Sequence, residues 1–109
     1  MYSIKKGVAI YFTEEIEKIL SVVCPLFKAF YLPVVITSGI DGPHRENSLH
    51  GKFRAIDIRK FFHDPYSCET WTLHHKMIFD GLRDGFHVNN FPVTVLDETD
   101  HIHIEWSGP

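Results

Sequence analysis

Three histidines and one aspartate in this sequence are of the types that bind catalytic metal ions. His50 and Asp57 lie seven positions apart in the stretch SLHGKFRAID, and His101 and His103 alternate in DHIHIEW near the end of the chain. Catalytic zinc commonly takes three ligands from His, Asp and Glu and leaves a fourth position for water. A single histidine is more often an ordinary surface residue, so the hypothesis of a zinc site depends on the combination.

The element that holds Asp57 is predicted from alternation. FRAIDIR, residues 53–59, places its two isoleucines on one face of a strand and Asp57 on the other. Two ligands of one zinc ion bring their donor atoms to within about 3.5 Å of each other, so the chain between His50 and Asp57 must fold back. Gly51 favours such a turn, because glycine adopts backbone conformations that other residues avoid.

The last part of the chain predicts a β-hairpin. Strands are expected at 92–96 and 101–106, joined by the acidic turn DETD. Alternation places His101, His103 and Glu105 on one strand face and the two isoleucines on the other. One histidine can therefore bind a metal ion while the other orients water or contacts the substrate.

Two helices and one further strand complete the predicted fold. Apolar residues recur at three and four positions from Thr13 to about residue 30, where Pro25 is expected to bend the helix or divide it in two. The β-branched run at 33–39 predicts a buried strand, and a second helix should run from residue 67 or 68 to about Leu82. We expect one α+β domain over residues 1–109, with helices packed on a small, mostly antiparallel sheet.

The composition argues against several classes of protein. With 44% hydrophobic residues the chain can bury a core without a disulfide or a structural metal, and Cys24 and Cys68 have no Cys-x-x-Cys partner. A net charge of -3 with scattered basic residues gives no electrostatic footprint for nucleic acid. No apolar run approaches the ~20 residues that span a membrane, and no signal peptide is evident. A monomer made in the cytoplasm is expected.

The two motifs together resemble a family of cell-wall enzymes. TSGIDGPHRENSLHGKFRAIDIR followed by DHIHIEW is similar to the zinc D-alanyl-D-alanine carboxypeptidases and L-alanyl-D-glutamate endopeptidases, especially their small phage-encoded members. That family's pattern is Ser-x-His-x-x-Gly-x-Ala-x-Asp, followed later by His-x-His. The residues that match this pattern are Ser48, His50, Ala55, Asp57, His101 and His103. The resemblance covers residues 37–106.

The resemblance implies that His50, Asp57 and His103 bind Zn²⁺ and that His101 assists in the active site. Zinc lowers the pKa of its bound water towards ~7, a carboxylate takes the proton, and the resulting hydroxide attacks a peptide carbonyl.

The carboxylate that acts as general base is left open among three residues of the acidic turn. Asp100 has the family's spacing from His103, Glu98 is the residue type that relatives use, and strict alternation would favour Asp97. We rank Asp100 slightly above Glu98.

Two positions depart from the family pattern. Phe53 occupies the position of the motif glycine, and Asp41 occupies that of an arginine that meets a substrate carboxylate. Arg45 is the nearest substitute, and the expected substrate-binding residues are therefore Arg45 and Ser48. The arginines held in reserve for this role are Arg54 and Arg59.

The resemblance implies a fold like that of hedgehog proteins and D-alanyl-D-alanine peptidases. The expected activity is hydrolysis of amide bonds in peptidoglycan stem peptides, endolysin-like or carboxypeptidase-like, after another factor delivers the protein to the bacterial cell wall. The alternative is a non-catalytic zinc-binding module of the same fold in a virion or signalling role.

Overall fold

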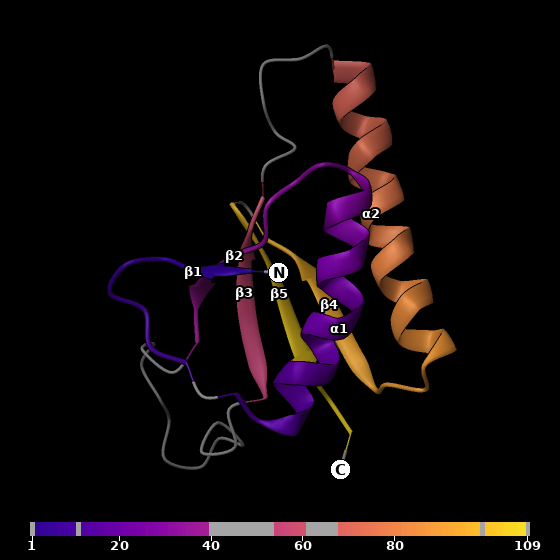
Figure 1. Cartoon of the computed structure of the whole chain (residues 1–109). Coiled ribbons are helices and arrows are strands. Elements are labelled where there is room, and N and C mark those ends of the chain that lie inside the picture. The colour runs from indigo at the N-terminus through magenta and orange to yellow at the C-terminus, as the bar shows by residue number, and fades with distance from the viewer. Residues whose placement is uncertain (1, 11, 40–53, 61–67, 99, 109) are drawn as a thin grey trace.

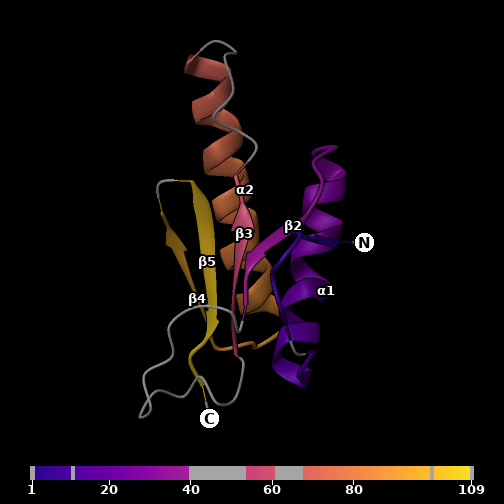
Figure 2. The same cartoon turned by 90° about the vertical axis from the view of Figure 1, so that its left-hand side faces the viewer.

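A computed structural model describes residues 2–10, 12–39, 54–60, 68–98 and 100–108, with the backbone alone for 68–73 (Figure 1). The elements are β1 (Ser3–Ile4), α1 (Glu14–Ala29), β2 (Val35–Ser38), β3 (Ala55–Arg59), α2 (Cys68–Val88), β4 (Val93–Asp97) and β5 (His101–Trp106). The five strands form one sheet in the order β1-β2-β3-β5-β4. Both helices pack on the same face of this sheet, and no described helix or strand covers the other face (Figures 1 and 2). We name this other face the open face.

The sheet is mixed, which corrects the expectation of a mostly antiparallel sheet. β1 pairs with β2 in parallel, whereas the other neighbouring strands pair antiparallel. Sequence patterning did not predict β1, because two residues are too few to display a period of two. The α+β class is confirmed.

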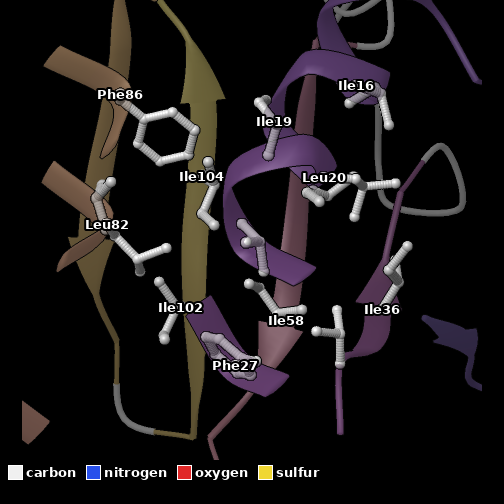
Figure 3. Close-up of a cluster of buried hydrophobic side chains, with 14 of the residues drawn as sticks. Ile16, Ile19, Leu20, Phe27, Ile36, Ile58, Leu82, Phe86, Ile102 and Ile104 are labelled. Carbon is white, nitrogen blue, oxygen red and sulfur yellow. The ribbon is translucent and has the colours of Figure 1, made fainter. Parts of the chain in front are cut away.

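The core lies between the helices and the sheet, and Figure 3 shows isoleucines of β3 and β5 pointing into it. Ile56 and Ile58 are at most 1% exposed, and Ile102 and Ile104 are fully buried. Because successive side chains of a strand point to opposite faces, the residues between these isoleucines lie on the open face. The predicted alternation of both strands is therefore confirmed.

α1 is one continuous helix through Pro25, so of the two expected outcomes, a bend or a division into two helices, the division is wrong. Thr13 caps the helix, since its side-chain oxygen accepts a hydrogen bond from the Ile16 N–H at 3.2 Å. An interior proline costs roughly 3 kcal/mol. Val23 and Phe27, on either side of Pro25, are both fully buried, and each such burial stabilises by about 1.5–3 kcal/mol. Packing of the two turns against the same core offsets the missing hydrogen bond.

α2 ends at Val88, past the predicted end near Leu82, and continues through both Asp-Gly pairs. Its glycines lie against α1 and do not end the helix. A Cβ at Gly81 would lie 2.8 Å from Leu26 Cδ1, and one at Gly85 would lie 2.6 Å from Val22 Cγ1. The glycines therefore permit a close approach of the two helices.

Candidate functional site

Asp57 of β3 and His103 of β5 face each other on the open face although they are 46 positions apart in sequence. His103 Nδ1 lies 2.8 Å from Asp57 Oδ1, and the two side chains are 28% and 22% exposed. On the other side of the ring, His103 Nε2 lies 3.4 Å from Glu105 Oε1. The hydrogen bond to Asp57 raises the pKa of His103, against the effect of burial, and Glu105 adds to the increase.

His101 extends this pair into a longer arrangement. Its Nδ1 lies 2.7 Å from Asp100 Oδ1, and its Nε2 lies 3.7 Å from Asp57 Oδ2. Carboxylates and imidazoles therefore alternate along the open face, in the order Asp100, His101, Asp57, His103 and Glu105. We name these five residues the acid–histidine row. Its members supply oxygen and nitrogen donors of the kind that zinc binds.

The turn between β4 and β5 places its acidic residues on different faces. Asp97 pairs with Ile102, and directly opposed residues of antiparallel strands share a face. Asp97 therefore lies on the helix side, and the placement beside the histidines that strict alternation predicts is wrong. The Glu98 N–H donates to the His101 carbonyl at 3.1 Å, and one further step in register sets Glu98 opposite His101 on the open face. Glu98 and Asp100 remain as candidates for the base.

β2 places Ser38 beside Asp57, and the sequence patterns did not predict this neighbour. Ile36 pairs with Ile58 and Ser38 pairs with Asp57, so the register between β2 and β3 shifts between Ile36 and Ser38. Thr37 Oγ1 also lies 3.4 Å from the Asp57 carbonyl oxygen. Such bulges are common beside active sites because they redirect a side chain. The sequence of a single strand does not predict a bulge, because a bulge depends on how that strand pairs with its neighbour.

The three candidate arginines occupy different places. Arg59 pairs with His101 across β3 and β5 and so lies on the open face. Arg54 is only 9% exposed, and its guanidinium donates to the Gly108 carbonyl near the end of the chain. Arg45 lies outside the described residues. The reserve candidate Arg59 is thus the described arginine that adjoins the acid–histidine row.

Two of the three predicted zinc ligands are close enough to bind one ion. Asp57 Oδ1 and His103 Nδ1 are 2.8 Å apart, whereas two donors on one tetrahedral zinc ion are ~3.5 Å apart. A small side-chain movement would therefore convert the hydrogen-bonded pair into a pair of zinc ligands. Among the described residues, no group of three His, Cys, Asp or Glu side chains is placed to hold a metal ion. The third predicted ligand, His50, and the substrate residue Ser48 lie outside those residues, as do Phe53 and Asp41.

Comparison with known proteins identified no relative of this chain. A scan against protein-family models and searches of curated proteins and of solved structures found no match. Within the part of the chain that the structure describes, neither helix has the length and apolar character to cross a membrane. The functional assignment must therefore be argued from the geometry of the site and the spacing of its residues.

Proposed function

We propose that this chain is a zinc-dependent peptidase that hydrolyses amide bonds in peptidoglycan stem peptides, in an endolysin-like or carboxypeptidase-like manner. The observation that carries the proposal is the pairing of Asp57 with His103, with His101 at their side. This arrangement joins residues from two distant motifs on the open face, which no described helix or strand covers. An ordinary strand face requires no such concentration of acids and imidazoles.

Asp57, His103 and His50 would hold the zinc ion. Their donor set of one carboxylate and two imidazoles is typical of catalytic zinc sites, which keep one position open. When bound, zinc polarises a peptide carbonyl and makes water a better nucleophile at neutral pH. Glu105 contacts the far nitrogen of His103 and would fix the orientation of that ring, as outer carboxylates do for histidine ligands.

The remaining residues of the row would move protons and bind charge. A carboxylate of the turn, Asp100 or Glu98, accepts the proton of the attacking water. Asp100 also accepts a hydrogen bond from His101 Nδ1, which leaves Nε2 directed towards Asp57. In its protonated form, His101 donates from Nε2 to the oxyanion of the tetrahedral intermediate. Arg59 would bind a carboxylate of the stem peptide.

The proposal is tested by digesting purified peptidoglycan and identifying the fragments by mass. We expect fragments cut at one type of amide bond. Removal of the base by Asp100→Asn or Glu98→Gln should lower the rate by about a hundredfold or more while zinc stays bound. Asp84→Asn, at an exposed position of α2, is the matched control and should leave the rate unchanged. Wild-type protein that binds zinc and cuts no stem peptide would indicate the non-catalytic alternative.

A further inference from the structure

A second group of charged residues lies on the helix side of the sheet, behind the turn between β4 and β5. The Lys60 ammonium group contacts the Asp97 carboxylate and donates a hydrogen bond to the Glu98 carbonyl. His75 of α2 approaches the other oxygen of Asp97, with Nε2 2.8 Å from Oδ2. The Lys60 side chain is only 7% exposed. The proposed reaction does not use this buried charge, so its position requires another explanation.

Electrostatics explains why Lys60 is held in one place. A buried ammonium group is costly unless it is paired and hydrogen-bonded, and the Lys60 side chain contacts Asp97 and Glu98 at the turn. Burial alone would raise the pKa of Asp97, but hydrogen bonds and charge from Lys60 and then His75 lower it overall. The lowered pKa favours the ionised form of the Asp97 carboxylate. His75 links the arrangement to α2.

The same lysine holds the backbone of both candidate bases. Its ammonium group binds the Glu98 carbonyl, and its backbone N–H lies 3.3 Å from the Asp100 carbonyl oxygen. The Asp100 side chain is 84% exposed and contacts His101 at 2.7 Å, so its position also depends on where the backbone of the turn is held. A catalytic carboxylate must be held close to its working geometry, because a misplacement of about 1 Å can cost a hundredfold in rate.

We infer that Lys60, anchored by Asp97 and His75, is a positioning residue that fixes the turn carrying Glu98 and Asp100 over the open face. Lys60 acts from behind the sheet, through the backbone, and touches neither zinc nor substrate. This inference rests on the proposed peptidase function for its catalytic consequence. Its structural consequence, a rigid turn, is independent of activity.

The experiment compares Lys60→Met with Lys76→Met, which makes the same change at an exposed lysine of α2. Methionine fills much of the space of lysine, and Asp97 keeps its contact with His75. Amide hydrogen exchange by NMR should become about tenfold faster at Glu98 in Lys60→Met while Ile104, in the central part of β5, is unaffected. The kcat for stem peptides should fall about tenfold or more, with KM and zinc content unchanged. Lys76→Met should match the wild type in every measurement.

A second variant keeps the inference testable if Lys60→Met does not fold. His75→Ala removes the contact between His75, which is 24% exposed, and Asp97, and should accelerate exchange at Glu98 by about threefold. Unchanged exchange at Glu98 in every folded variant would overturn the inference, as would an unchanged kcat in folded Lys60→Met. Wild-type protein that cleaves no stem peptide is a different result, because it overturns the proposed function and leaves the exchange measurement intact.

Discussion

Replacement of Asp57 by asparagine should destabilise the zinc-free protein at mildly acidic pH and have much less effect at alkaline pH. The Asp57 hydrogen bond is the largest cause of the raised pKa of His103, whose ordinary value is 6.5. A folded-state pKa above the unfolded one means that protonation favours folding. This contribution is complete below pH 6.5 and is lost as the pH rises through the raised pKa of the folded state.

The size of the effect follows from the geometry of the pair. A hydrogen bond to a charged group contributes about 1.5–3 kcal/mol. Because His103 and Asp57 are 28% and 22% exposed, we expect a value near the lower limit. Asparagine keeps the shape and an acceptor oxygen but not the charge. At about pH 5.5 His103 carries its proton, because its pKa is raised above the ordinary value of 6.5.

The assay is urea unfolding followed by circular dichroism, with a chelator present, at about pH 5.5 and about pH 9. Asp57→Asn should lower the free energy of unfolding by about 1.5 kcal/mol at the lower pH and by less than about 0.5 kcal/mol at the higher. Asp84→Asn should show no such pH-dependent difference. Equal destabilisation by Asp57→Asn at both pH values would refute the reasoning, because the loss would then not depend on the charge of His103.

Three further predictions concern packing, substrate binding and metal dependence. Gly85→Ala should lower the thermal unfolding temperature, because its Cβ would lie 2.6 Å from Val22 Cγ1 and overpacking costs about 1–3 kcal/mol, more than the gain in helix propensity. Adding Val22→Ala should recover most of the loss, and a Gly85→Ala protein as stable as the wild type would show that the helices tolerate the extra methyl group. Arg59→Met should raise KM for stem peptides about tenfold with little change in kcat, whereas an unchanged KM would exclude Arg59 from substrate binding. A chelator should abolish hydrolysis and added zinc should restore it; hydrolysis that persists after zinc is removed would contradict the mechanism.

Local patterning was sufficient to predict which side chains share a strand face. In both β3 and β5, buried isoleucines alternate with more exposed residues, so a period of two was enough to place Asp57 and His103 on the faces of their strands that point away from the core. To predict that Asp57 pairs directly with His103, one must know the register between β3 and β5, and the two residues are 46 positions apart in sequence. The resemblance to zinc peptidases implied that these two side chains lie close together, but the pairing of their strands was not predicted.

The features that sequence reasoning missed arise from contacts between elements. The turn after β4 places Asp97 beside Lys60 and His75, whereas simple alternation would have placed it beside the histidines. The second helix was expected to end near Leu82, but Gly85 continues it and lies against Val22 of α1. Ser38 is paired with Asp57 because the register between β2 and β3 shifts, and such a shift depends on how two strands pair. Each of these outcomes is decided by tertiary packing and leaves no periodic trace in the sequence.

Zinc content after dialysis tests the central claim most directly, because the claim is that Asp57 and His103 bind one metal ion together. Wild-type protein should retain about one zinc per chain, and His103→Ala and Asp57→Asn should each retain almost none. His87→Ala, at an exposed histidine in the last turn of α2, should bind zinc like the wild type. Equal zinc content in the wild type and His103→Ala, or no zinc in the wild type, would contradict the account.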